Sequence, residues 1–494
     1  MMQRPFILRP AAPRYAVNAD RAAPVALFVL HLALALYYHF GLGISITADP
    51  LRSTWDWWWQ TLSIDLLRSN PIEALWHLHA QPPLHNAFGA LVIHLFGDAH
   101  LEVIHIAHMV LGGLIAVLSF STTRMISGSR LLALLVGLAV ALNPALFLFE
   151  ANPLYDIPTI ALLMLAVWFA ARFENKRRLI DLYGMVGALT ALTLLRSLYH
   201  PFLLIPAVLL SAALAGERWR RAVLVTALIA ALPFVWATKN AVQFNFWGMS
   251  SWSGMNLWKI VVSGYTPEEL LGLAEAGVIA RMPAEVERFS LPEAYVPYGF
   301  DRRSDIAALA QNDYNNVNIP AISLVYQEAA LTLIRRDPAR YFQQAFIAYS
   351  IFTCPATRFE FVRQNAERIA AHNALYADAF YLAPLTQRLS PLFCSAQFFL
   401  IPVLLFAFWL PAIIRCRASL SCWRDAVRAG PAVFVIAGLM TYTVVVGSLL
   451  EIPENARFKL MIEPLLWVFG GVLVGRLVER AQARHRQRRD AVVC

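Results

Sequence analysis

The sequence has little charge for its length. Only 15% of its 494 residues are Asp, Glu, Lys or Arg, and 59% are hydrophobic, whereas an average soluble chain is about 25% charged. Of its 41 basic residues only four are Lys. This composition excludes a disordered, fibrous or coiled-coil protein. It predicts an all-α polytopic membrane protein with several spans.

The chain also has few cysteines, and their spacing does not resemble a zinc site. There are five, at positions 354, 394, 416, 422 and 494. Cys354 and Cys394 lie where a disulfide would persist if that part of the chain faces outward, but we expect unpaired thiols. Seven of the 12 His lie between His77 and His108 without an HExxH pattern, so we predict no metal centre from them.

Ten apolar runs are long enough to form membrane spans, which need roughly 20 residues. They start near Ala22, Leu101, Leu131, Tyr155, Leu179, Pro201, Ala222, Leu392, Pro431 and Phe458. An eleventh run, Leu84–Phe96, has 13 residues and contains His85, Asn86 and His94. We interpret this shorter run as a helix in the plane of the membrane or a re-entrant one.

The basic residues predict the orientation of these spans. With ten spans, 23 basic residues fall on one side and five on the short loops of the other. Positively charged loops stay in the cytoplasm, so both termini are predicted to be cytoplasmic, in a bacterial inner membrane. We predict that the active site faces the periplasm.

The spans divide the chain into three predicted parts. Residues 1–237 form an N-terminal membrane module, whose first outer loop (44–100) carries the predicted catalytic acid. Residues 238–391 form a large, mostly helical periplasmic segment with amphipathic patterns such as Ile322–Ile334, and loops of this length are usually functional. Residues 392–494 form the last spans and a basic cytoplasmic tail.

Polar side chains stand out in the short outer turns, where ionisable groups near a membrane invite a functional interpretation. The candidate acids are Asp49, Asp56 and Glu150. The candidate phosphate-binding cations are Arg196, Arg457 and Lys459. The candidate substrate-binding residues are His79, Gln81, His85, Tyr155 and His200.

Together these groups suit sugar transfer from a lipid-linked phosphate. A carboxylate would take the proton from an acceptor hydroxyl as that hydroxyl attacks the anomeric carbon. The phosphate would leave as an anion held by Arg and Lys. A single displacement of this kind inverts the sugar.

Four features make the chain resemble the GT-C superfamily of polyprenyl-phosphate-sugar-dependent glycosyltransferases, especially bacterial proteins similar to protein O-mannosyltransferases and lipid A aminoarabinose transferases. The features are an Asp after the first span, the turn Gln81-Pro82-Pro83-Leu84 before a short helix, Glu150 in the second outer loop, and the element Glu454–Lys459 before the last span. The segment Trp247–Asn256 is similar to uncharacterised members of the same branch.

The resemblance implies a bundle of about ten transmembrane helices with juxtamembrane helices facing outward. It also implies a catalytic base at the first-loop Asp, which is Asp49 by position, with Asp56 as the close second. Glu150 takes the place of the second-loop acid. Some members need a divalent cation (Mg²⁺ or Mn²⁺) and others do not. The implied partners are a polyprenyl-phosphate-linked sugar, a glycan, lipid or protein acceptor and the bilayer, with no nucleic acid.

Two other classes of protein stay open at this point. A secondary transporter would show inverted repeats and broken helices at the midplane, and the sequence shows neither. A different membrane enzyme, either an acyltransferase or a His-metal enzyme, would use His79, His105 and His108.

Overall fold

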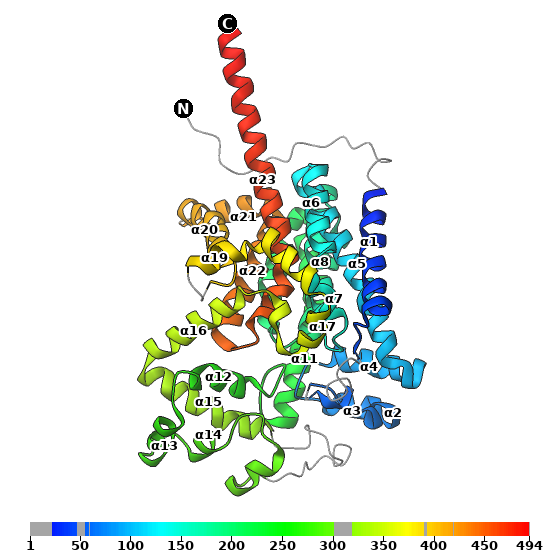
Figure 1. Cartoon of the computed structure of the whole chain (residues 1–494). Helices are drawn as coiled ribbons and strands as arrows, with labels where there is room; N and C mark the ends of the chain where they lie inside the picture. The colour runs from blue at the N-terminus through cyan, green and yellow to red at the C-terminus, as the bar shows by residue number, and fades with distance from the viewer. Residues whose placement is uncertain are drawn as a thin grey trace.

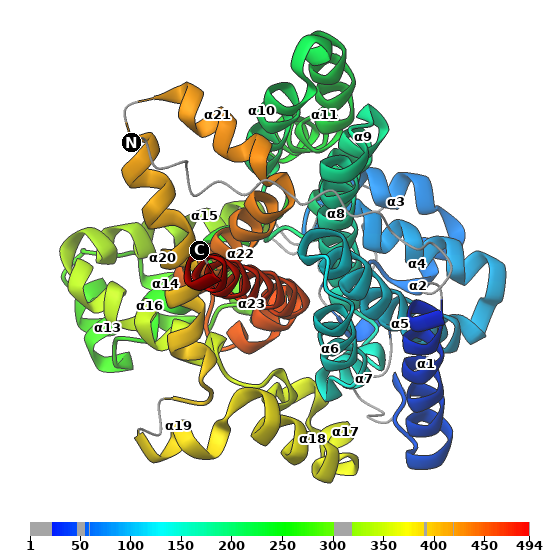
Figure 2. The same ribbon diagram turned by 90° about the horizontal axis from the view of Figure 1, so that it is seen from above.

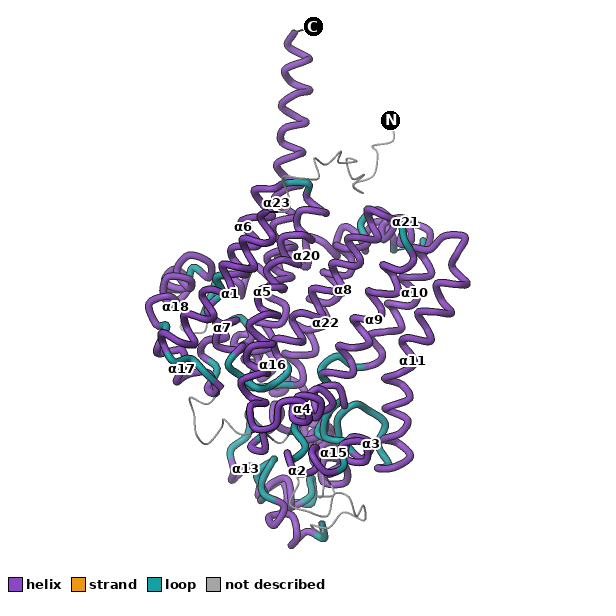
Figure 3. The backbone as a smooth tube through the Cα atoms, turned by 90° about the vertical axis from the view of Figure 1, so that its right-hand side faces the viewer, coloured by secondary structure: helices purple, strands orange, loops and turns teal. Residues whose placement is uncertain are grey.

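The computed structural model describes residues 22–46, 55–58, 60–300, 319–389, 393–417 and 419–493. Within these ranges the chain consists of helices and loops, without a strand (Figure 3). The predicted all-α class is therefore confirmed.

Each of the ten apolar runs predicted to span the membrane contributes a helix to one bundle (Figure 1). The bundle helices are α1 (Ala22–Leu42), α5 (His100–Ser127), α6 (Arg130–Ala141), α7 (Pro144–Glu150), α8 (Asp156–Lys176), α9 (Leu179–Leu195), α10 (Leu204–Ala215), α11 (Trp219–Phe244), α20 (Gln397–Cys416), α22 (Pro431–Leu450) and α23 (Asn455–Val493). Seven stretches of the described chain are long and apolar enough to cross a membrane, or eight if the bent pair α6–α7 is one span. The chain is a multi-pass membrane protein, and the count of ten stays a prediction because α9 has 17 residues and α10 has 12.

The bend between α6 and α7 measures 46° and follows from the local sequence. Pro144 cannot continue the helix that precedes it, because it has no N–H and restricts the backbone of Asn143. The Asn143 side chain then caps α7 by accepting a hydrogen bond from the Ala145 N–H at 3.0 Å.

A second group of helices, which we call the cap, lies at the end of the bundle opposite the C-terminus (Figure 1). It consists of α2 (Ile64–Ser69), α3 (Pro71–His77), α4 (Pro83–Phe96), α12 (Ser253–Val262), α13 (Pro267–Glu275), α14 (Arg281–Glu285), α15 (Ile319–Arg336) and α16 (Pro338–Phe352). The short helix expected after Pro82-Pro83 is α4. The apolar face of α15 buries Ile322, Tyr326 and Leu333 at helical spacing.

The cap has its own hydrophobic core, to which residues 46–104 and 252–348 both contribute. Hydrogen bonds from residues that precede the second segment, on α11 and in the loop after it, reinforce the position of the first segment. The Lys239 ammonium donates to the Leu78 carbonyl at 2.8 Å, and the Ser251 N–H donates to the His79 carbonyl at 3.0 Å. Residues 46–104 and 252–348, which belong to the two long outer pieces of the sequence, therefore share one core, whereas Phe359, Val362 and Ile369 of the second piece pack into the core of the bundle.

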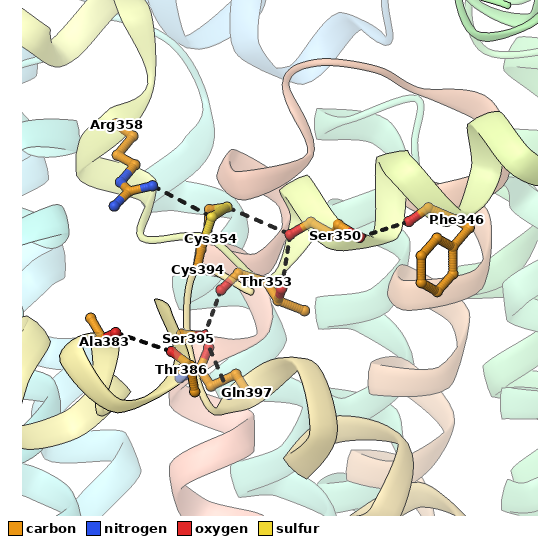
Figure 4. Close-up of a disulfide and its surroundings, with 10 residues drawn as sticks. All are labelled: Phe346, Ser350, Thr353, Cys354, Arg358, Ala383, Thr386, Cys394, Ser395 and Gln397. Carbon is orange, nitrogen blue, oxygen red and sulfur yellow. Dashed lines mark hydrogen bonds between the residues drawn. A yellow bond between two sulfur atoms is a disulfide. The ribbon is translucent and has the colours of Figure 1, made fainter. Parts of the chain in front are cut away.

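The structure corrects the expectation of unpaired thiols. Cys354 and Cys394 form a disulfide with a Cα–Cα distance of 4.8 Å (Figure 4), and Cys416 and Cys422 form another. The first bond closes a 40-residue loop that contains α17 (Arg363–Arg368), α18 (Ala370–Tyr376) and α19 (Ala383–Leu389). Closing a loop of this length is worth about 4 kcal/mol in the chain-entropy model. Two cysteines 40 residues apart give no signal in the sequence that their Cα atoms meet.

Candidate active site

The turn between α7 and α8 places Tyr155 and Asp156 at the end of the bundle that borders the cap. The Asn152 side chain accepts a hydrogen bond from the Leu154 N–H at 3.2 Å, which fixes the turn. The Tyr155 carbonyl then accepts from the Thr159 N–H at 2.9 Å as α8 begins. Asp156 occupies the first turn of α8, where the positive end of the helix dipole stabilises a carboxylate.

Two arginines from distant parts of the chain converge on Asp156. Arg196 follows the last residue of α9, and Arg457 lies in the first turn of α23. Asp156 Oδ1 accepts from Arg196 Nη1 at 2.8 Å and from Arg457 Nε at 2.7 Å. All three side chains are buried, so one carboxylate holds two guanidinium groups in fixed orientations.

Aromatic rings surround the two guanidinium groups. The Tyr155 ring lies 4.9 Å from the Arg196 guanidinium carbon and 5.7 Å from that of Arg457. His85 contacts the same ring edge-on at 5.2 Å, and Trp55 stacks on His85 at 5.0 Å. Burial raises the pKa of Tyr155, so its hydroxyl stays protonated. These rings form one wall of the candidate site.

A second set of charges links this site to the cap. The Arg457 Nη1 donates to Glu454 at 3.2 Å, and the Lys259 ammonium of α12 contacts Glu454 at 3.3 Å and also Glu451. Burial raises the pKa of Glu451 to about 7. Burial also opposes ionisation of Glu454, but Lys259 and Arg457 outweigh it and lower the pKa. We call these three cations and three acids, centred on Asp156, the Asp156 network.

Three buried polar atoms of this region have no hydrogen-bond partner among the described residues. They are Asp156 Oδ2, Arg457 Nη2 and His85 Nε2. Buried polar groups are nearly always hydrogen-bonded, so each exception needs an explanation. A bound ligand that accepts from Arg457, contacts His85 and donates to Asp156 Oδ2 would supply the missing partners.

The structure brings several predicted site residues together. Arg196, Arg457, Tyr155 and His85 form the centre described above. Gln81 lies beside them, because its Oε1 accepts from the Ser197 hydroxyl at 3.0 Å. His79 and His200 are farther out. His79 Nδ1 lies 3.0 Å from the Ser251 hydroxyl in the cap, and the His200 ring lies 5.6 Å from that of Trp247.

Two predicted residues lie elsewhere, inside the bundle. Glu150 is 1% exposed, and its Oε1 lies 2.6 Å from Nε2 of His31 on α1. Lys459 is fully buried, lies 3.2 Å from Glu463 one turn later on α23, and packs against the Tyr381 ring at 4.2 Å. Neither residue contacts the Asp156 network through a hydrogen bond or ion pair that the structure shows.

The two candidate bases differ in what is known of their surroundings. Asp49 lies outside the described residues. Asp56 is exposed, and its Oδ1 accepts from the Ile64 N–H at 2.7 Å, so one of its oxygens is engaged at the start of α2.

A small cavity of about 50 Å³ lies next to the α7–α8 turn. It is lined by Ser45, Ile46, Trp58, Ala151, Asn152, Pro153, Glu360, Phe361, Gln364 and Asn365. The Asn152 Nδ2 and Asn365 Oδ1 atoms are buried there and have no hydrogen-bond partner in the described part of the chain. The cavity is therefore lined by two amide side chains that each have a hydrogen-bonding atom not used within the described residues.

Sequence reasoning did not select Asp156, Glu454 or Lys259 as site residues. Two signals were available. Lys259 is one of only four Lys, and Asp156 belongs to the same predicted outer turn as Glu150. As to metal ions, the described residues contain no group of three or more His, Cys, Asp or Glu side chains placed to hold one. We assign no step to a metal.

Comparisons with known proteins agree with the resemblance seen in the sequence. Residues 80–239, about a third of the chain, match the model of the family described as dolichyl-phosphate-mannose-protein mannosyltransferase. The matched stretch contains His85, Tyr155, Asp156 and Arg196 but not Arg457. No curated protein matches the chain significantly.

Solved structures with a similar course of the chain include two membrane proteins. The oligosaccharyltransferase AglB from Archaeoglobus fulgidus, in complex with an inhibitory peptide and a dolichol-phosphate, is 14% identical with a TM-score of 0.40, over 94% of this chain and 52% of its own. ArnT from Cupriavidus metallidurans in the apo state is 17% identical with a TM-score of 0.31, over 86% and 77%. The structure of ArnT from Cupriavidus metallidurans bound to undecaprenyl phosphate is 16% identical with a TM-score of 0.31, again over 86% of this chain and 77% of its own. The chain spans about half the length of AglB.

The family match covers the α7–α8 turn and the arginine after α9. The predicted resemblance is thereby confirmed: the chain is similar to the GT-C glycosyltransferases.

Proposed function

We propose that the protein transfers a sugar from a polyprenyl-phosphate donor to an acceptor at the junction of the bundle and the cap. The observation that carries this proposal is the convergence of Arg196 and Arg457 on Asp156 at a membrane-proximal turn. We place this junction on the periplasmic side of a bacterial inner membrane, with both termini in the cytoplasm, because of the basic residues at the opposite end of the bundle.

The Asp156 network is suited to a phosphate leaving group. Asp156 occupies one N–H of each guanidinium group and so holds both planes in place, while Arg457 Nη2 keeps a free donor. Arginine forks match the geometry of phosphate oxygens. Because the donors are fixed before the reaction, they stabilise the negative charge that develops on the phosphate without having to reorganise.

The proposed reaction is a single displacement. The acceptor oxygen forms a bond to the anomeric carbon while the bond from that carbon to the phosphate oxygen breaks, and the sugar is inverted. The acceptor proton passes to a carboxylate, for which we propose Asp49, since one oxygen of Asp56 is engaged by Ile64. Polyprenyl phosphate leaves with both electrons of the broken bond.

We assign the remaining predicted residues to the walls of the site. Gln81, His85 and Tyr155 lie next to the arginines and are the proposed contacts to the sugar. His79 and His200 form its rim. Glu150 bonds His31 inside the bundle, so we assign it to packing and give Asp156 the place of the second-loop acid.

The test uses the full chain in lipid nanodiscs, with undecaprenyl-phosphate donors that carry either a hexose or a pentose and a cell-envelope extract as acceptor. Release of undecaprenyl phosphate is measured, which does not require the acceptor to be known. Asp49→Asn should lower release at least 100-fold. Asp56→Asn should stay within about threefold, since the Asn oxygen can still accept from Ile64.

A matched control is Asp337→Asn. The Asp337 side chain also accepts a hydrogen bond from a backbone N–H in the first turn of a helix, that of Arg340 on α16, at 3.0 Å. It should leave release unchanged. A loss confined to Asp56→Asn would move the base to Asp56. If the wild-type chain released no undecaprenyl phosphate from either donor, the proposed function would be wrong.

A further inference from the structure

An apolar cavity of about 730 Å³, which we call the α20 furrow, lies between α20 and the helices α6 and α23. Its lining includes Leu135 and Ala139 of α6, Leu404 and Ala412 of α20, and Leu466 and Val474 of α23. It does not include any residue of the Asp156 network. The furrow is thus separate from the candidate active site.

Helix α20 packs poorly against the rest of the bundle. From Pro402 to Arg415, all of them described residues, none of its side chains is buried. Only 17% of its most apolar window is buried, against 50% for α22. Figure 2 shows α20 and α21 (Leu420–Ala429) on the outer side of α22 and α23. An apolar helix face without protein contacts must be covered by another apolar group, because an empty gap forfeits dispersion energy.

The two ends of the furrow differ in chemistry. One end is closed by Phe380 and Trp467, whose rings meet edge-on at 5.4 Å. The other end is lined by Arg415 and Arg476. The furrow follows α20 from Leu400 to Arg415, 16 residues with 15 helical rises between them, which is about 22 Å. Half of a bilayer, including its headgroups, is also about 20–22 Å thick.

We propose that the α20 furrow binds one anionic phospholipid. Its phosphate lies at Arg415 and Arg476, and an acyl chain runs along α20 toward Phe380. The distance between the two groups of arginines argues against the sugar donor as the occupant. Arg476 follows Arg457 by 19 residues on the same helix, so the cationic end lies about 28 Å from the arginines of the candidate active site. The bound lipid would hold α20 and α21 against the bundle.

The test measures lipid retention, so its outcome is independent of the proposed function. The full chain in detergent is incubated with phosphatidylglycerol or phosphatidylcholine of identical acyl chains, and retained lipid is counted by native mass spectrometry. Phosphatidylglycerol should be retained preferentially. The variant Arg415→Gln/Arg476→Gln should weaken this retention about 30-fold. Arg220→Gln/Arg221→Gln, two exposed arginines at the same end of the bundle outside the furrow, should not change it.

A second variant fills the furrow without altering charge. Ala412→Trp should abolish retention of phosphatidylglycerol while thermal unfolding shows a folded chain, which keeps the proposal testable if the double arginine variant fails to fold. Equal retention of both lipids, or an equal loss in the control variant, would overturn the proposal. Displacement of phosphatidylglycerol by equimolar undecaprenyl phosphate would overturn it as well, because the furrow would then take the donor lipid.

Discussion

The Asp156 network and the pair formed by Lys459 and Glu463 are both buried, yet their charges are organised differently. Asp156 shares one oxygen between Arg196 and Arg457 and leaves Arg457 Nη2 without a partner. Lys459 pairs with one acid of its own helix, and the Tyr381 hydroxyl donates to that same acid at 2.6 Å. Lys459 Nζ and Glu463 Oε2 also make no hydrogen bond within the described part of the chain. The two groups therefore differ in place: the network lies where the bundle meets the cap, whereas the pair is enclosed inside the bundle.

The difference arises from helix geometry. Arg457 and Lys459 are two residues apart on α23, and successive residues of a helix turn by about 100°, so their side chains point about 200° apart. Two cations of one short motif therefore cannot both face one phosphate. The one that faces the cap becomes available for binding, and the one that faces the bundle must be neutralised there.

The largest effect is expected from Arg457→Gln. It removes the free N–H donor and one of the two partners of Asp156, so transfer should fall at least 100-fold. Arg457→Lys keeps the positive charge but not the planar set of N–H donors of the guanidinium group, so transfer should fall about tenfold. Both are measured as release of undecaprenyl phosphate in nanodiscs.

Arg340→Gln is the matched control, since Arg340 is a cap arginine paired with Glu269 at 3.3 Å and partly exposed. It should retain wild-type release. Full activity of Arg457→Gln would show that the Asp156 network only stabilises the junction of bundle and cap.

Lys459→Met should affect stability instead of transfer. It leaves Glu463 as a buried charge without its cation, which costs about 3–5 kcal/mol in the free energy of unfolding. Adding Glu463→Gln should recover most of this loss, because the Gln oxygen can still accept from Tyr381. Thermal unfolding in detergent and the specific activity of folded protein are compared. A folded Lys459→Met variant that has lost transfer would restore Lys459 to the donor site, as the sequence predicts.

Much of the fold could be predicted from hydropathy because each apolar run has to form a helix inside a membrane. Arg196 and Arg457 could also be selected, since cations are rare in the short outer turns. The separation of Arg457 from Lys459 was readable from helical periodicity, once Asn455 was known to begin a helix.

Other features depend on tertiary geometry. Glu150 and Asp156 are six residues apart in one predicted turn, and the acid that meets the arginines is determined by the bend of α7 and by the position of α1, which brings His31 to Glu150. The disulfide between Cys354 and Cys394 depends on how α16 and α20 meet. Neither is a local property of the sequence.

The smallest effect is a pH dependence at the outer edge of the Asp156 network. The Glu451 carboxyl faces Lys259 and Glu454, and burial raises its pKa from an ordinary 4.5 to about 7. The folded chain thus binds this proton more tightly than the unfolded chain, so folding stability should fall as the pH rises from 5 through 7 and level off above.

Glu451→Gln keeps the group neutral and should remove this part of the pH dependence, so its melting temperature relative to wild type should be highest at pH 8. The exposed Glu268→Gln serves as the control. An unchanged slope in Glu451→Gln would mean that Lys259 keeps Glu451 ionised over the whole range, and the network would then hold three fully ionised acids opposite its three cations.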